Sequence, residues 1–365
     1  SGQLSEYDNP SSEWKNDKVD GDLSFGMKYP ITSSITAEVA MNPDFSQVES
    51  DAAQINVNET FALFYPEKRP FFQEGSDMYS RWFNTAYTRS INDPQLAAKI
   101  TGRMGNTRIA YIAARDEHSP VILPFEERSA YLQAGESFSN IILANQTVGD
   151  YSQLNFTLTD RRLDGGGSGT LAGFDGDIRL TQKHYLQWSL VATHTSEPDD
   201  TSMTSGLNDY LFDEGRHTAA FDGESFWGHA FYLSTGRMSK HEVLDISYYE
   251  RSPRFRADNG FEPRNNQRRI QFYAGYNLYP NGKLVHQLRP YIRAGRIWNF
   301  NSMIKEDYIS IEMDAHLTAQ ASIHPAFYIN RENYLGVQFD NIWLFHFCAH
   351  SDFSKPLGIN MAANY

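Results

Sequence analysis

A stretch of strictly alternating side chains, residues 308–320, constrains the fold more than any other part of the chain. Six apolar positions alternate with six polar ones over residues 309–320, which places the two kinds on opposite faces of a β-strand. Strands in soluble proteins usually have about 5–6 residues, whereas a strand that crosses a membrane needs about 9–11 residues with one apolar face. The pattern therefore predicts a long strand with one apolar and one polar face.

Shorter forms of this alternation recur along the chain, at residues 35–41, 154–159, 174–181, 186–193, 227–233 and 270–278. Short turns join some of these stretches, such as the hairpin expected at residues 104–107, where Gly and Asn tolerate a positive φ. Two long polar connections, residues 195–218 and 252–268, separate others, and we expect both to lie outside the membrane. Counting such segments gives about 14–16 strands, since bacterial single-chain barrels have an even number.

Aromatic side chains stand near the ends of these strands, where they suit the interfacial girdles of a membrane barrel. They are Trp188, Trp227, Tyr248, Tyr279, Trp298, Tyr308 and Trp343. The predicted fold class is all-β, a transmembrane, antiparallel, up-and-down β-barrel. We expect residues 1–20 to form a polar N-terminal lead-in and residues 21–365 to form a single outer-membrane β-barrel domain.

Composition excludes several other classes of protein. The net charge is -13 without a basic block, so no nucleic-acid partner is expected. Cys348 is the one cysteine, which excludes an internal disulfide and a cysteine-rich metal site. No HExxH, GxSxG, P-loop or dinucleotide motif occurs, so we predict no catalytic residue, metal or cofactor.

The segment around residues 65–75 fits neither helical nor strand periodicity. Pro66 and Pro70 bracket three consecutive charges, and proline disrupts both kinds of regular structure. We predict an inward-folded or plug-like segment near residues 65–75. The lumen or plug candidates are Glu67, Lys68, Arg69, Phe71, Phe72 and Glu74.

Two interpretations of these candidates remain open. The charges could line a constriction inside a lumen and set solute selectivity, or they could pair with inward-facing Asp and Arg residues and pin the segment. The second is favoured because buried charges persist when they are paired. Phe71 and Phe72 are interpreted as packing anchors rather than a platform for a ligand.

A second set of candidates lies in the polar loop 252–268. Asp258, Asn259 and Arg264 could recognise a sugar or a partner. The alternative is that Gly260 serves a backbone turn and Arg264 forms a salt bridge that fixes the loop.

Asp175 and Asp177 are two residues apart on one predicted strand, so they share a face. A glycosidase pair of carboxylates needs about 5–9 Å between its members, which this spacing allows. Inward polar rows on a barrel produce such pairs by default, so we assign neither residue a catalytic role.

Three motifs resemble one known family: NPDFSQVESDAAQINVNETFALFYPEKRPFFQEG at 42–75, AAKITGRMG at 97–105 and FRADNGFEPRNNQRR at 255–269. That family is a group of bacterial outer-membrane β-barrel domains of uncharacterised function. Its members often lie C-terminal to a domain like the family 9 carbohydrate-binding modules. The resemblance implies a porin-like barrel in the outer membrane of a Gram-negative bacterium.

We therefore predict an outer-membrane protein that acts as a channel, a transporter or a docking scaffold for a solute, peptide or partner protein. Its expected partners are outer-membrane lipid and, in addition, another protein chain or a carbohydrate or peptide ligand. Two alternatives stay open: a membrane-embedded hydrolase that uses lumen carboxylates, and a soluble all-β carbohydrate-binding protein.

Overall fold

The computed structural model describes residues 23–43, 60–79, 81–280, 282–351 and 360–365. It also places the backbone of two short paired strands, β1 (Gly2–Gln3) and β2 (Lys15–Asn16). Apart from these strands, the predicted lead-in of residues 1–20 lies outside the described residues, as do residues 44–59 of the first motif.

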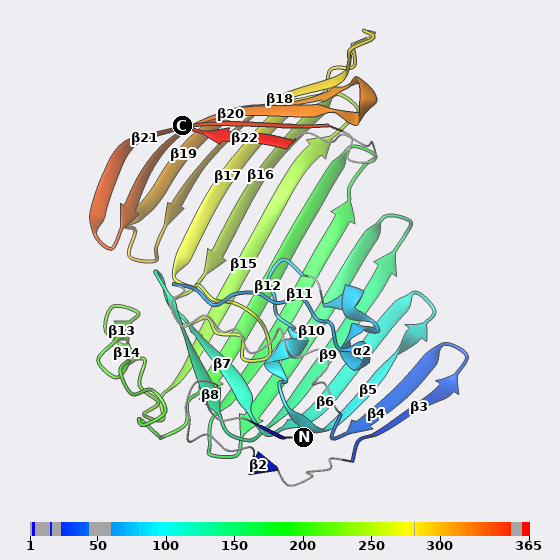
Figure 1. The fold of residues 1–365 in the computed structure, drawn as a ribbon, viewed down its shortest axis with the longest axis vertical. Coiled ribbons are helices and arrows are strands. Elements are labelled where there is room, and N and C mark those ends of the chain that lie inside the picture. The colour runs from blue at the N-terminus through cyan, green and yellow to red at the C-terminus, as the bar shows by residue number, and fades with distance from the viewer. Residues whose placement is uncertain are drawn as a thin grey trace.

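One sheet of 16 antiparallel strands dominates the described part of the chain (Figure 1). Its strands are β3 (Phe25–Thr32), β4 (Ile35–Met41), β5 (Pro94–Met104), β6 (Thr107–Asp116), β9 (Ser137–Val148), β10 (Ser152–Leu163), β11 (Ser168–Arg179), β12 (His184–Ser196), β15 (Ser225–Met238), β16 (Glu242–Arg251), β17 (Gln267–Tyr276), β18 (Val285–Trp298), β19 (Ile304–Leu317), β20 (Ser322–Tyr334), β21 (Val337–His350) and β22 (Asn360–Asn364). Each strand pairs with the next sheet strand along the chain. The all-β class, the antiparallel up-and-down order and the expected 14–16 strands are confirmed.

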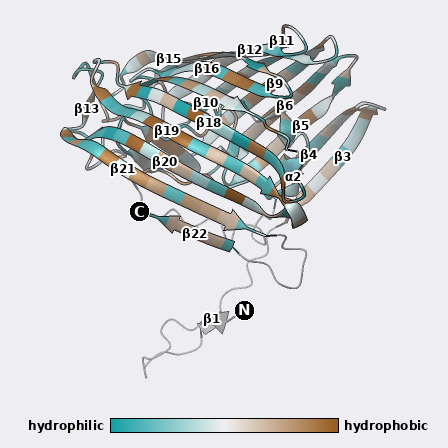
Figure 2. Cartoon of the chain, turned by 90° about the horizontal axis from the view of Figure 1, so that it is seen from above, coloured by the Kyte–Doolittle hydropathy of each residue, from teal (hydrophilic) through white to brown (hydrophobic). Residues whose placement is uncertain are grey.

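The sheet curves strongly, with β3 and β22 at its two ends (Figures 1 and 2). Within the described residues, β3 pairs with β4 and β22 pairs with β21, but β3 and β22 do not pair with each other. The predicted closure into a barrel is therefore not observed, because β3 and β22 each pair along one edge only. Among the helices of the described ranges, none is long and apolar enough to cross a membrane.

The strand predicted at residues 308–320 is displaced toward the N-terminus. It is β19, which ends at Leu317, and the next three residues form the short 3-10 helix η3 (Thr318–Gln320). Ala319 and Gln320 take φ values of 58° and 55°, so the backbone turns there instead of continuing the strand. The hairpin at residues 104–107 is confirmed, with Gly105 at φ 61° between β5 and β6.

The two faces of the sheet carry opposite kinds of side chain. Residues paired across neighbouring strands share a face, so the register assigns each side chain to one of them. Exposed apolar residues of the outward face are Phe138, Ile142, Phe156, Phe174, Leu190, Leu233, Leu244, Ile246, Ile270, Phe272, Ile309, Ile311, Ile329 and Trp343. Buried polar residues of the concave face include Ser139, Asn145, Thr157, Thr159, Arg161, Asp175, Ser189, Thr193, Ser234, Ser310 and Glu312.

Three insertions interrupt the sheet order. Residues 60–93 carry α2 (Pro70–Gln73), η1 (Ser76–Met78) and η2 (Thr88–Ser90). The second insertion is the separate hairpin of β7 (Ser119–Pro124) and β8 (Ser129–Ala134), and the third holds β13 (Leu211–Phe212) and β14 (His217–Thr218). We call residues 60–93 the inward segment, because they cross the concave side of the sheet (Figure 1).

An apolar patch on the concave wall receives the inward segment. Phe71, Phe72, Met78 and Ile91 are buried in one cluster with wall residues. The wall residues of that cluster are Ala40, Ala97, Ala110, Ile112, Ala114, Ile141 and Leu143. Several are alanines, whose small side chains leave room for the segment, and burying each phenylalanine stabilises the packing by about 1.5–3 kcal/mol.

Candidate functional site

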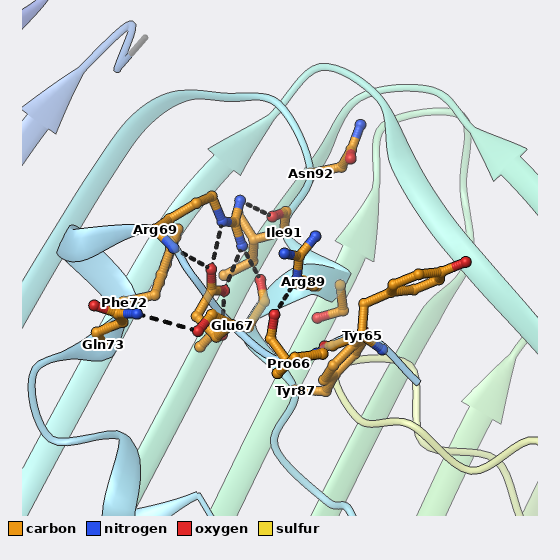
Figure 3. A network of polar contacts seen from close by, with 12 residues as sticks. Tyr65, Pro66, Glu67, Arg69, Phe72, Gln73, Tyr87, Arg89, Ile91 and Asn92 are labelled. Carbon is orange, nitrogen blue, oxygen red and sulfur yellow. Dashed lines mark hydrogen bonds and ion pairs between the residues drawn. The ribbon is translucent and has the colours of Figure 1, made fainter. Parts of the chain in front are cut away.

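Glu67 and Arg69, two of the predicted lumen or plug candidates, form the centre of a polar network in the inward segment (Figure 3). The guanidinium of Arg69 donates to both carboxylate oxygens of Glu67 at 2.9 and 2.8 Å. It also donates to the carbonyl oxygens of Ile91 at 2.8 Å and Thr88 at 2.9 Å. Only 3% of Arg69 is exposed, so this pair joins the two ends of the segment in a nearly dry environment.

Further hydrogen bonds join residues 65–66 to residues 87–89 within the inward segment. The amide of Tyr65 donates to the hydroxyl of Tyr87 at 3.2 Å, and that hydroxyl donates to the Tyr65 carbonyl at 3.0 Å. Arg89 donates from Nε to the carbonyl of Pro66 at 2.9 Å. Pro70 opens α2 at a position where a missing N–H leaves nothing unsatisfied. The irregular sequence thus forms an ordered loop.

The wall of the sheet holds the segment through a buried lysine. Lys99 of β5 is 2% exposed, and its Nζ donates to the carbonyl oxygen of Phe71. The same ammonium lies 3.1 Å from a carboxylate oxygen of Glu38 and 3.9 Å from one of Glu74. Glu74 also pairs with Lys28 at 2.5 Å. Lysines of the wall, rather than the expected inward arginines, are therefore the partners of Glu74.

A second wall residue, Arg161 of β10, holds the far end of the segment. It is 1% exposed and donates to the carbonyl oxygens of Ser90 at 2.5 Å and Pro120 at 2.8 Å. Its Nε donates to the hydroxyl of Ser139 at 3.2 Å. One guanidinium thereby connects the sheet, the inward segment and the β7–β8 hairpin. Lys68, the remaining charged candidate, is exposed.

The loop of the second candidate set folds back onto the inward segment. Tyr87 donates its N–H to the carbonyl of Asn259 at 2.8 Å, and Phe261 donates to the carbonyl of Asn84 at 2.8 Å. The amide of Asn84 in turn donates to a carboxylate oxygen of Glu262 at 2.7 Å. Asn259 is fully buried. The sequence predicts that residues 252–268 form a recognition loop outside the membrane; the structure pairs part of their backbone with the inward segment.

The other two loop candidates have partners within the protein. Asp258 accepts a hydrogen bond from Nε of Arg256 at 2.7 Å. Arg264 donates to the carbonyl of Glu126 at 2.8 Å and lies 3.9 Å from the carboxylate of Glu127. Gly260 donates its N–H to the carbonyl of Ala257 in a turn. A Cβ at Gly260 would meet the carbonyl oxygen of Asn84 at 2.3 Å, so the close approach requires glycine.

Arg256 links this loop to the connection that follows β12. Its NH1 donates to Glu197 at 3.2 Å, and the two side chains are 6% and 3% exposed. Burial raises the pKa of Glu197 to about 8, because desolvation outweighs the attraction of Arg256, and Glu224 and Asp222 add repulsion. This carboxyl therefore titrates near neutral pH.

A polar cavity of about 510 Å³ lies beside η1, near the short-turn ends of the strands. Arg81 and Asp175 form an ion pair at 3.7 Å on one side, and Arg108 lies 2.7 Å from Asp77 on another. Asp177 accepts a hydrogen bond from Gln187 at 3.2 Å. The lining also includes Met78, Trp82, Asn145, Gln153, Asn155 and Gly176. Asp175 is thus engaged with a guanidinium of the inward segment.

The concave wall of β18–β20 carries a polar network of its own. Glu312 accepts hydrogen bonds from Ser310 at 2.6 Å, Tyr291 at 2.9 Å and Tyr328 at 3.3 Å. Asp314 accepts from Nε of Arg289 at 3.0 Å and contacts Nδ1 of His324 at 2.7 Å. These residues share a face with the wall beneath the inward segment, because the register is continuous through β16–β18 and from Gln287 to Ile297 between β18 and β19.

Sequence reasoning missed the wall residues that hold the inward segment. Lys99 and Arg161 were not among the candidates, although Lys99 lies inside the second motif, and Arg81 of the inward segment itself was also missed. A signal exists for Lys99 and Arg161: each is a charge on a strand face whose preceding member is small, Ala97 or Thr159. Such a charge, buried among small residues, requires an inward partner.

The profile of a domain of unknown function, DUF5916, matches residues 3–105. The first two motifs fall inside this match and the third, residues 255–269, falls outside it. A search of curated proteins found no match.

Three solved structures are similar to this chain. Pseudomonas aeruginosa OccK8 (OprE) is 11% identical with a TM-score of 0.40, and the match covers 82% of this chain and 74% of the OccK8 chain. Pseudomonas aeruginosa OccD3 (OpdP) is 9% identical with a TM-score of 0.37, covering 74% and 67%. Acinetobacter baumannii OccAB3 is 7% identical with a TM-score of 0.39, covering 97% and 93%. Because TM-scores this low do not establish a common fold, we infer the function from the geometry of this chain.

Replacing Glu67 by alanine should loosen the inward segment. Arg69 would keep its burial but lose its carboxylate, and breaking a buried pair in this way costs about 3–5 kcal/mol. The urea midpoint of the detergent-solubilised protein measures the loss. Lys68→Ala, an exposed neighbour, should shift stability by at most about 0.5 kcal/mol. Equal midpoints for the two variants would contradict a stabilising role for the pair.

Stability should fall as pH rises through the range in which Glu197 titrates. Its pKa is about 8 when folded, against an ordinary value of 4.5, so the folded state holds an extra proton between these values. Stability therefore declines from about pH 5 to pH 8 and levels off above that. The free energy of unfolding, measured at about pH 5 and pH 8, should decline less for Glu197→Gln than for the unaltered protein. Glu214→Gln, on the same connection, should behave as the unaltered protein does.

Proposed function

We propose that this chain is an outer-membrane β-barrel that forms a channel for small polar solutes. The observation that carries the proposal is the inverted pattern of the sheet's two faces. Large apolar side chains are exposed on the outward face while serines, threonines and paired charges are buried on the concave face. A contiguous apolar surface of this extent needs a non-aqueous environment, which argues against the soluble alternative.

A membrane location requires the sheet to close. Unpaired N–H and C=O groups on β3 and β22 would each cost several kcal/mol in hydrocarbon. The chain order already places these strands at the two ends of a curved sheet. We propose that β3 and β22 pair in the membrane and complete a barrel of 16 strands, an even number typical of bacterial barrels.

The inward segment divides the proposed lumen into two parts. On one side it packs on β4–β9 through its apolar cluster. On the other side the wall of β18–β20 presents Arg289, Glu312 and Asp314, with the carboxylates hydrogen-bonded by tyrosines and a histidine. Charged and polar side chains on a lumen wall favour hydrated ions and polar solutes. The segment then acts as a constriction that narrows the passage.

Cross-linking tests the closure. In a Cys348→Ser background, cysteine at position 29 of β3 should form a disulfide with cysteine at 361, 362 or 363 of β22. Paired strands bring Cα atoms within the distance of about 4.4–6.8 Å that a disulfide requires. Leu190→Cys on β12 is the control and should not cross-link to position 29. Non-reducing gels read the outcome, and a failure of all three pairs in lipid would contradict closure.

Conductance in planar bilayers tests the channel. Purified protein should produce discrete conductance steps, and Asp177→Asn should shift ion selectivity away from cations because it removes a lumen carboxylate. The reversal potential in a salt gradient measures this shift. Asp160→Asn, on the outward face of β10, is the matched control and should leave the potential unchanged. Absence of any conductance would reject the channel in favour of a docking scaffold.

A further inference from the structure

Two arginines and one aspartate form a cluster on the outward face of the sheet. Arg296 of β18 contacts Asp307 of β19 with Nε at 2.5 Å and NH2 at 3.1 Å. Arg331 of β20 donates from NH2 to the same carboxylate. One carboxylate therefore holds two guanidiniums side by side, and the cluster carries an excess of one positive charge.

The register places this cluster beside exposed apolar residues. Arg296 pairs across the sheet with Ile270 on one side and Asp307 on the other, and Asp307 pairs with Arg331. Two residues away on β19 and β20 are Ile309 and Ile329, which share the outward face. The cluster lies two or three residues from the ends of β18–β20, at the edge of the apolar surface.

An open groove of about 920 Å³ joins the cluster to the apolar surface. Its apolar walls are Ile246, Ile270, Phe272, Ile309 and Ile329. These five side chains are between 39% and 48% exposed. The groove therefore combines an apolar part with a polar part, which holds the two guanidiniums, Asp307 and Asp340.

The two guanidiniums keep donors available for a ligand. Each arginine carries five N–H donors, of which Asp307 occupies two on Arg296 and one on Arg331. Their side chains are 51% and 42% exposed. Asp340 also lines the groove, and its two carboxylate oxygens accept from Gln338 at 2.8 and 2.9 Å. The lining therefore holds two arginines and two aspartates, and an anion is attracted by the remaining N–H donors rather than by a net charge. The face that the arginines present is thus suited to an anion.

We infer that this groove binds one membrane lipid, with its phosphate between Arg296 and Arg331 and an acyl chain along the isoleucines. The inference rests on the proposed membrane location. Guanidinium N–H donors that face lipid without an acceptor are costly, and a lipid phosphate accepts from them in charge-assisted, bidentate hydrogen bonds. The apolar groove distinguishes a lipid from free phosphate, which has nothing to place there.

Titration of the detergent-solubilised protein with phosphatidylglycerol, followed by native mass spectrometry, tests the site. The double variant R296Q/R331Q should bind this lipid about tenfold more weakly, which is a change of about 1.4 kcal/mol. The matched control is Arg162→Gln, since Arg162 is an outward arginine paired with Asp160 at 3.0 Å but does not line the groove. Equal lipid binding by the double variant and the unaltered protein would overturn the inference.

A second variant, Asp307→Asn, tests the site if R296Q/R331Q does not fold. Asp307→Asn keeps both guanidiniums and removes their carboxylate, so it should bind phosphatidylglycerol more tightly, whereas unchanged or weaker binding would overturn the inference. Inorganic phosphate in tenfold excess over lipid should not displace the lipid, and displacement would reject a lipid ligand. A protein that stays monodisperse without detergent would instead reject the proposed membrane location, and this inference with it.

Discussion

The structure depends on one constraint, the strict alternation of side chains along strands paired in fixed register. A slip of one residue between two strands would turn an entire apolar set from the outward face to the concave face. The register through β9–β12 and β15–β18 keeps Phe174, Leu190 and Phe272 on one side of the sheet and Asp175 and Ser189 on the other. Everything on the concave side follows from that separation.

The inward segment is possible only because the concave face offers charged partners. A loop of 34 residues (60–93) brings many backbone groups into the interior, and buried backbone groups need hydrogen-bond partners. Lys99 and Arg161 donate to segment carbonyls, and Asp116 accepts from the amides of Asn92 and Asp93. The wall thus supplies donors and acceptors at the points where the segment itself has none.

The parts of the fold that the sequence predicted are those governed by short-range order. Alternation within one strand identifies its faces, so the all-β class and the number of strands followed from local patterns. The end of β19 did not, because Ala319 and Gln320 adopt positive φ without the glycine or asparagine that usually marks such a turn. Residue type alone gave no signal for that turn.

In the candidate site, too, contacts between residues near in sequence could be predicted and contacts between distant residues could not. Proline and charge spacing marked residues 65–75 as irregular, and the pairing of Glu67 with Arg69 spans two residues. Contacts between distant stretches were not predictable from composition: Asn84 meets Glu262 across 178 residues. A polar loop such as residues 252–268 looks exposed in sequence because its hydrogen-bond partners lie elsewhere in the chain. Burial of Asn259 is therefore a tertiary property.

The same arginine–carboxylate chemistry has opposite consequences on the two faces. Around Arg69, one carboxylate and two backbone carbonyls satisfy a single guanidinium, so the group is closed to ligands and holds the segment. Around Asp307, one carboxylate serves two guanidiniums that remain about half exposed. A closed group stabilises the fold, whereas guanidinium donors that stay open at an apolar boundary favour an external acceptor. The ratio of acceptors to guanidiniums therefore separates structural pairs from candidate binding sites in this sheet.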